Sequence, residues 1–337
     1  MGPVAALDRV IYLLDRALAE SRKVRAFIRA RDVAREVGDD ELVERHKAGT
    51  LTELAGIGPV TAGVIGEALD GQVPSYIAKL EDETVIPLGE GADLRAALKG
   101  DCHSHSTWSD GGASIEAMAR AAQELGHEYL VMTDHSPRLT VAHGLTAERL
   151  RAQLAEVRDL NNKLAPFRIL TGIEVDILPD GQLDQSPALL AELDVVVASV
   201  HSKLRMPRQE MTRRMVLAMA NPVVDILGHC TGRKLVGGMR PPSQFDPEIV
   251  FAACARFDVA LEINCRPERQ DPPDELLAEA IDWELRFSID TDAHAPGQLE
   301  WQNYGCDKAA RAGLGPERIV NAQSADDLLA WAGSNPA

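Results

Sequence analysis

Residues Tyr129-Leu-Val-Met-Thr133-Asp134-His135 contain a short β-rich run that ends directly in polar residues. A run of this kind is typical of a buried strand, and the polar residues then mark its carboxyl end. From residue 100 onward, such runs alternate with helical patterns, for example over residues 114–125 and 147–164. We predict seven strands, over residues 102–105, 129–133, 168–173, 194–200, 223–227, 259–263 and 286–289.

The alternation of strands and helices predicts an α/β fold with a parallel sheet, and seven units are enough to close into a barrel. Nearly every predicted strand ends in a residue type that binds metal ions. Strand carboxyl ends converge on one mouth of an α/β barrel, so side chains distant in sequence meet there. The candidate ligands are His103, His105, Asp110, His135, Glu174, His201, His229, Asp292 and His294.

The number of candidate ligands predicts more than one metal ion. His103 and His105 are two residues apart on a predicted strand, so both side chains point to the same side. Six imidazoles and three carboxylates exceed the needs of one tetrahedral site. We therefore expect two or three divalent ions, and mixed imidazole and carboxylate ligands suit manganese, zinc or iron. The remaining histidines, His46, His127 and His143, are interpreted as surface or loop residues.

A multinuclear metal cluster favours phosphate-ester hydrolysis. It holds a hydroxide, the expected nucleophile, near neutral pH and clamps the phosphate oxygens during in-line displacement. Cationic side chains nearby would neutralise the charge that grows on the phosphoryl group. The candidates are Lys203, Arg233, Arg266 and Arg269, and each has an alternative interpretation as a surface salt-bridge residue.

Several neighbouring residues have two interpretations. Asp101, Asp134 and Asp290 either orient ligating imidazoles or cap turns. The five cysteines form no C-x-x-C pair, and packing is the favoured role for those beside the predicted site. The chain has no signal-like start and no apolar run of about 18 residues, so we expect a cytoplasmic protein without a membrane partner.

Residues 1–80 are predicted to be all-helical. Leu7, Ile11, Leu14 and Leu18 recur at helical spacing, with charged residues on the other face. Two short apolar helical patterns flank Gly56-Ile57-Gly58, and these glycines permit a tight turn with positive φ. We interpret residues 81–99 as a linker and residues 100–337 as the barrel domain.

The motifs of the barrel region resemble those of the PHP (polymerase and histidinol phosphatase) superfamily. The resemblance implies a distorted (β/α)7 TIM-like barrel with a trinuclear metal site, and all nine ligand positions of that pattern are filled here. The matching motifs are Asp101-x-His103-x-His105-x-x-x-Ser109-Asp110-Gly111, Thr133-Asp134-His135, Gly172-x-Glu174, Ser199-x-His201, Gly228-His229 and Asp292-x-His294.

Within the superfamily, the chain is most similar to the C-terminal PHP domain of bacterial family X DNA polymerases. The segments 228–233 and 262–271 carry this likeness. The amino-terminal region is similar to the helix-hairpin-helix domain of the same group. That likeness implies a hairpin whose backbone amides, near Gly56, Ile57 and Gly58, hold a DNA phosphate.

The chain departs from the polymerase pattern in two ways. A catalytic palm separates the two regions in the family polymerase, whereas only about 20 residues separate them here, so polymerase activity is not expected. In the related eukaryotic enzyme, a lysine of the second hairpin helix forms a Schiff base with abasic sugar. Val64 stands at the matching position and Val60 at another usual lysine position, which weighs against lyase activity.

Three functions remain open at the level of the sequence. The first is a phosphoesterase for DNA 3′ ends in repair, a 3′-5′ exonuclease or a 3′-phosphatase. The second is a small-molecule phosphatase of the histidinol-phosphatase type, which the net charge of −17 favours because DNA is itself anionic. The third is a non-catalytic, metal-stabilised DNA-binding module. The sequence predicts no oligomeric state.

Overall fold

The computed structural model describes residues 1–334 and divides into two compact units. The first unit comprises Met1–Ile86 with Pro296–Gln298, and the second comprises the remainder of the described chain. The last three residues of the predicted barrel domain, 335–337, lie outside the described residues. No helix within residues 1–334 combines the length and the apolar character needed to cross a bilayer.

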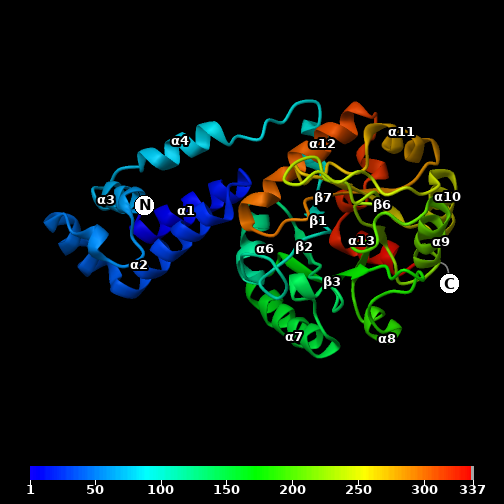
Figure 1. The fold of residues 1–337 in the computed structure, drawn as a ribbon, viewed down its shortest axis with the longest axis horizontal. Helices are drawn as coiled ribbons and strands as arrows, with labels where there is room; N and C mark the ends of the chain where they lie inside the picture. The colour runs from blue at the N-terminus through cyan, green and yellow to red at the C-terminus, as the bar shows by residue number, and fades with distance from the viewer. Residues whose placement is uncertain (335–337) are drawn as a thin grey trace. The chain divides into compact units, whose positions relative to one another are not determined.

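The first unit is all-helical, as predicted (Figure 1). Its core gathers Leu7 and Leu14 with Phe27 and Ile65. Leu18, expected on the same helical face, lies beyond the end of the first helix with a φ of 51°. The helices are α1 (Pro3–Arg16), α2 (Ser21–Ala48, kinked at Gly38), α3 (Pro59–Leu69) and α4 (Ser75–Glu83), with the 3-10 turn η1 (Leu51–Glu53) before α3.

The second unit contains a seven-stranded parallel sheet whose strands follow one another in chain order over the described residues. A parallel bridge between Ser104 and Ala293 joins the segments that follow the first and last strands, so the barrel is nearly closed. The predicted TIM-like α/β fold is therefore confirmed. The strands are β1 (Gly100–Asp101), β2 (Tyr129–Met132), β3 (Arg168–Asp176), β4 (Val195–Ser199), β5 (Ile226–Leu227), β6 (Ala260–Asn264) and β7 (Phe287–Asp290).

The first strand is the one that was placed wrongly. It was predicted over residues 102–105, but β1 pairs with β2 only at Gly100 and Asp101. Beyond this point the amide of Ser104 bonds to the hydroxyl of Thr133 and the amide of His105 bonds to the carbonyl of Ala293. The two histidines therefore follow the strand instead of forming it.

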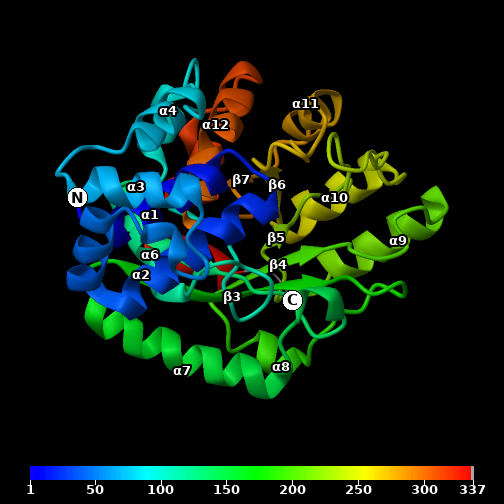
Figure 2. The same cartoon turned by 60° about the vertical axis from the view of Figure 1, so that its left-hand side comes forward.

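Helices surround the strands of the second unit, as Figure 2 shows for α7 and for α9 to α12. Ser114 caps α6 by accepting a hydrogen bond from the amide of Ala117, which explains why this helix starts at Ile115. The helices are α5 (Ala92–Ala97), α6 (Ile115–Glu124), α7 (Ala147–Leu164), α8 (Pro187–Leu190), α9 (Arg208–Met219), α10 (Pro247–Phe257), α11 (Asp274–Asp282), α12 (Gln302–Arg311) and α13 (Ala325–Ala332). The chain also forms the 3-10 turns η2 (Thr140–Ala142), η3 (Pro296–Trp301), η4 (Pro316–Arg318) and η5 (Val320–Ala322).

Apolar side chains fill one end of the barrel interior. Tyr129 and Val131 alternate with Leu130 along β2, because successive side chains of a strand point to opposite faces. Tyr129 and Val131 belong to one apolar cluster with Leu328 and Trp331 of α13, whereas Leu130 packs with residues of α6 and α7. The helix α13 thus covers the amino end of the barrel, and the polar side chains gather at the carboxyl end.

Candidate metal centre

Glu174, on β3, lies at the centre of a cluster of buried imidazoles. Its Oε2 atom is 2.8 Å from His135 Nδ1 and 3.3 Å from His103 Nε2. Its Oε1 atom is 2.8 Å from His229 Nε2 and 3.1 Å from His201 Nε2. One carboxylate therefore contacts side chains that follow β1, β2, β4 and β5.

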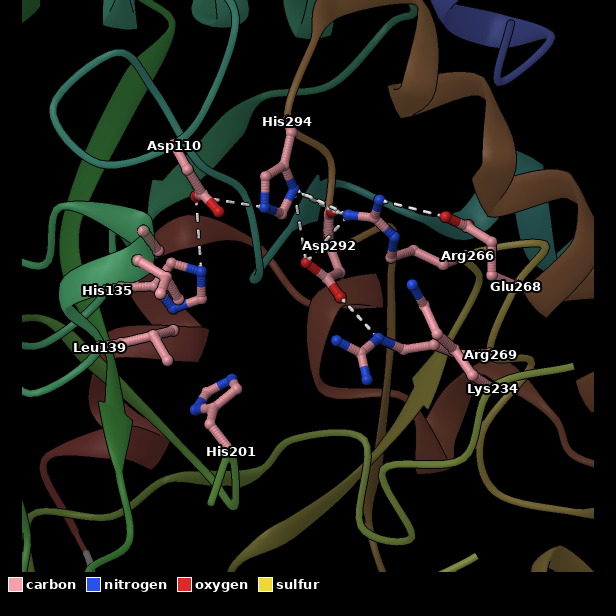
Figure 3. Close-up of a pocket in the computed structure, with 12 residues that line it drawn as sticks. Asp110, His135, Leu139, His201, Lys234, Arg266, Glu268, Arg269, Asp292 and His294 are labelled. Carbon is pink, nitrogen blue, oxygen red and sulfur yellow. Dashed lines mark hydrogen bonds and ion pairs between the residues drawn. The ribbon is translucent and has the colours of Figure 1, made fainter. Parts of the chain in front are cut away.

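Two further carboxylates, the exposed Asp110 and the buried Asp292, extend the cluster. Asp110 Oδ1 is 3.3 Å from His294 Nε2 and 3.5 Å from His135 Nε2 (Figure 3). Asp292 Oδ1 is 3.3 Å from His105 Nε2 and 3.6 Å from His294 Nδ1. The structure thus brings all nine predicted ligands into one continuous cluster at the carboxyl end of the barrel.

Three overlapping groups within the described residues have the geometry of a metal site. In each group, one donor atom per residue lies within 4.8 Å of every other donor. Two of the groups share Glu174, two share His105 and two share His135. The groups are His105, Asp110, His135 and His294; His103, His105 and Glu174; and His135, Glu174 and His201.

The donor atoms of this cluster fit divalent cations. The buried atoms His103 Nε2, His105 Nε2, His201 Nε2 and Glu174 Oε2 have no hydrogen-bond partner within the protein, although they face one another. A buried polar atom without a partner costs about 1–3 kcal/mol. Cations bound between these atoms would satisfy them together, so the side chains form a metal-binding cluster.

The carboxylates of the cluster are held in their charged form. Burial favours the neutral acid at Glu174, but the neighbouring His201, His103 and His135 outweigh it and hold the pKa of Glu174 well below its usual range. Burial is likewise outweighed at Asp292, where Arg266 and His103 keep the pKa well below its usual range. Both groups are therefore anionic, as metal ligands must be.

Glu262 and Asp176 position two of the imidazoles, and sequence reasoning missed both roles. Glu262 Oε1 lies 2.5 Å from His103 Nδ1, and its Oε2 accepts a hydrogen bond from the His229 amide. Asp176 Oδ1 accepts a hydrogen bond from the His201 amide at 3.0 Å and lies 3.4 Å from its Nδ1. In the sequence, Glu262 could have been recognised because it is a carboxylate within the otherwise apolar run 259–263.

The three aspartates that were expected to orient imidazoles or cap turns bind the backbone. Asp134 accepts hydrogen bonds from the amides of Ser106 and Ser109, which shape the loop that carries Asp110. Asp101 accepts from the amide of His103 and the hydroxyl of Thr291, and Asp290 accepts from the amide of Cys102. The three aspartates therefore hold in place the chain segments that carry the ligands.

A cavity of about 210 Å³ opens above the cluster, and three cationic side chains line one part of it (Figure 3). Arg269 Nε lies 3.3 Å from Asp292 Oδ2. Arg266 Nη1 lies 2.8 Å from His294 Nδ1 and donates to the Asp292 carbonyl at 2.9 Å. The third is Lys234, which sequence reasoning missed although it follows Arg233 directly.

The other cationic candidates lie elsewhere. Lys203 is exposed and does not belong to the residues that line the cavity. Arg233 also lies outside the lining, and its Nε atom donates a hydrogen bond to the carbonyl oxygen of Arg269 at 2.9 Å. Of the residues predicted to contact a phosphate, Arg269 and Arg266 therefore face the cavity.

The histidines and cysteines outside the predicted cluster have separate roles. His46 and His143 are partly or fully exposed, but His127, expected at the surface or in a loop, is a buried loop residue. Burial, with a smaller contribution from Arg95, lowers the pKa of His127 to about 3. All five cysteines are buried free thiols, and burial raises the pKa of Cys230 well above its usual range, in keeping with a packing role.

In the first unit, two amides of the turn Gly56–Gly58 are already bonded within the protein. Gly56 adopts a φ of 108°, which favours glycine. The amide of Ile57 donates to the carbonyl of Leu54, and the amide of Gly58 donates to the hydroxyl of Thr61. Val64 is buried in the core of this unit, at 2% exposure. A phosphate held by the Gly58 amide would have to displace the hydroxyl of Thr61.

Comparison with known proteins agrees with the motifs of the barrel. Residues 101–246 match the family model of the PHP domain. The "DNA polymerase/3'-5' exonuclease PolX" of Bacillus subtilis is 41% identical over 260 residues, which cover 77% of this chain and 44% of that protein. The chain therefore spans less than half the length of this relative.

Two shorter proteins are also similar. A "probable phosphatase" of Thermoanaerobacter is 29% identical over 233 residues, which cover 66% of this chain and 89% of that protein. Among solved structures, the histidinol phosphate phosphatase of Lactococcus lactis, complexed with zinc, L-histidinol and phosphate, aligns with a TM-score of 0.47 and 19% identity. That alignment covers 65% of this chain and 95% of the phosphatase.

Proposed function

We propose that the chain, whose residues 101–246 match the PHP domain, is a metal-dependent phosphoesterase that removes nucleotides or phosphates from DNA 3′ ends in repair. One observation carries this proposal: a cluster of buried imidazoles and carboxylates shares a cavity with Lys234, Arg266 and Arg269. The cluster suits divalent cations, and the cationic side chains suit a phosphate group. We propose two or three ions, with manganese or zinc preferred to iron.

The bound cations and the cationic side chains of the cavity have different roles in the proposed reaction. When bound, the cations withdraw charge from the phosphoryl oxygens and lower the pKa of a water molecule. Arg269 and Lys234 face the same cavity and would meet the negative charge that develops in the transition state. Arg266 bonds to the Asp292 carbonyl and to His294, so it also holds this part of the ligand set in place.

Two features support a DNA substrate. The first unit places a glycine hairpin, Gly56–Gly58, directly before α3, and backbone amides at such a turn can bind a DNA phosphate without reading the bases. The relative of Bacillus subtilis is named both a polymerase and a 3'-5' exonuclease. DNA as a partner and a cytoplasmic location are parts of this proposal.

A small-molecule phosphatase is the second candidate, and specific observations favour it. Several shorter relatives are named probable phosphatases. The net charge of −17 also disfavours a long polyanion.

Digestion of 3′-labelled DNA distinguishes the candidates. With manganese present, we expect the wild-type protein to shorten the DNA or to release a 3′ phosphate. The double variant His103→Ala/His105→Ala should lose at least about 100-fold of this activity. His143→Ala, at an exposed histidine outside the cluster, is the matched control and should retain it. Turnover of histidinol phosphate alone would favour the second candidate, and no turnover of any ester would indicate the non-catalytic module.

A further inference from the structure

The loop between β6 and α11, residues 265–272, presents both arginines of the cavity. We call it the arginine loop. Its ends are joined by a hydrogen bond from the amide of Asn264 to the carbonyl of Asp271, at 2.8 Å. The Asp271 carboxylate accepts hydrogen bonds from the amide and the hydroxyl of Thr231, in the segment after β5. The arginine loop is thus attached to the segment that follows His229.

Lys308, on α12, lies behind the arginine loop and is 8% exposed. Its ammonium group donates to the carbonyl oxygens of Gln270, at 3.1 Å, and of Pro272. It also lies 2.9 Å from Asp274 Oδ1. An ammonium group has three donors, and these contacts use all of them. Two of the three donors of Lys308 therefore bind the backbone of the arginine loop, and the third binds the carboxylate at the start of α11.

Arg233 holds the same loop from the side of β5. Its Nε atom donates to the carbonyl oxygen of Arg269 at 2.9 Å, and its Nη2 atom donates to that of Gln270. Gln270 adopts a φ of 46°, a conformation that is uncommon for residues other than glycine. Two cationic side chains therefore bond to the carbonyl of a residue in a strained conformation, directly after Arg269.

We propose that Lys308 and Arg233 are positioning residues that hold the guanidinium group of Arg269 toward the cavity. Neither side chain lines the cavity, so each acts through the arginine loop. This inference rests on the proposed function only in assuming that Arg269 meets the phosphate of the substrate. Removal of Lys308 takes the donor from the buried carbonyl oxygen of Pro272, and removal of Arg233 takes the donor from the carbonyl oxygen of Arg269. The loop then relaxes into conformations that turn Arg269 away.

Binding of inorganic phosphate to the manganese-loaded protein tests the role of Lys308. We expect Lys308→Met to weaken phosphate binding about tenfold in a calorimetric titration, and Lys308→Arg to restore part of the loss. The KM for p-nitrophenyl phosphate should rise similarly, while kcat changes less. Arg311→Met, at an exposed position of the same helix, is the matched control and should bind phosphate as the wild type does.

A double-mutant cycle with Arg269→Ala separates positioning from a general structural effect. If Lys308 acts through Arg269, Lys308→Met should change phosphate affinity by less than about twofold once Arg269 is absent. Equal losses in both backgrounds, or wild-type affinity in Lys308→Met alone, would overturn the proposal. If Lys308→Met fails to fold, Arg233→Lys tests the same loop by the same cycle. If the protein does not digest DNA, the proposed function is contradicted. The phosphate affinities expected for these variants do not depend on that result.

Discussion

A single buried carboxylate, Glu262, orients the fully buried imidazole of His103. Its oxygen is 2.5 Å from Nδ1 of His103, so the Nε2 atom of that ring is directed toward Glu174. Carboxylates in this position fix the ring of a ligating histidine and raise its basicity, and their loss typically weakens metal binding 10–100-fold.

We therefore expect Glu262→Gln to weaken manganese binding by about 10-fold or more, because the amide is a weaker acceptor for the ring. A metal titration of the purified variant measures this change. Glu128→Gln, at a surface carboxylate paired with Lys99, serves as the control and should leave the affinity unchanged. Wild-type affinity in Glu262→Gln would contradict the orienting role.

The loop that carries Asp110 is shaped by Asp134, which follows β2. The Asp134 carboxylate accepts hydrogen bonds from the amides of Ser106 and Ser109 and from the side chain of Gln153. Burial raises the pKa of Asp134, although the hydrogen bonds from Ser109 and Ser106 oppose the shift. The carboxylate that follows β2 thus shapes the loop after β1, and this loop carries Asp110.

Asp134→Ala removes the acceptor of the Ser106 amide and of the Ser106 and Ser109 hydroxyls, so we expect the free energy of unfolding to fall by about 2–4 kcal/mol. Urea denaturation followed by circular dichroism measures this loss. The exposed Asp159→Ala on α7 should unfold as the wild type does. Equal stability of the two variants would show that Asp134 does not hold this loop.

Among the elements, strands β2 to β7 overlap the predicted runs, and β1 does not. The other six runs were recognisable because strands buried on both faces are rich in apolar residues. The first run was misplaced because its alternation of histidines resembles a strand. In the folded chain, the amides of that segment bond to Thr133 and Ala293 after the ladder with β2 has ended.

For the molecule as a whole, cation binding should contribute to stability. Ligands drawn from several strand ends are assembled only in the folded chain, so cations bind the native state and stabilise it. At a free metal concentration of about 100 times the Kd, this contribution is about 2.7 kcal/mol, or roughly 5 °C in Tm for a chain of this size class.

Chelation should therefore lower the Tm of the wild-type protein by about 5 °C, and added manganese should restore it. The variant His103→Ala/His105→Ala should respond to the chelator much less, because it lacks two of the ligands. Differential scanning calorimetry measures both shifts. A wild-type Tm that is insensitive to chelator and metal would argue against cations bound at this cluster.

The linear chain contains enough information to predict the α/β barrel and the candidate ligand set. Strand periodicity and residue type are local properties, and parallel strands bring their carboxyl ends together in any barrel of this kind. The nine side chains could therefore be named from their positions at strand ends, before any distance was known.

The contacts that support the ligands and the cavity could be identified only in the folded structure. Glu262 orients His103, Lys234 faces the cavity, and Arg233 bonds to the arginine loop while Lys203 lies outside the lining. A residue type and its spacing do not indicate which of several nearby cations points inward, because this depends on the path of each loop. That path is set by long-range hydrogen bonds, such as those from Lys308 to Gln270 and Pro272, whose partners are separated by more than 30 residues of sequence.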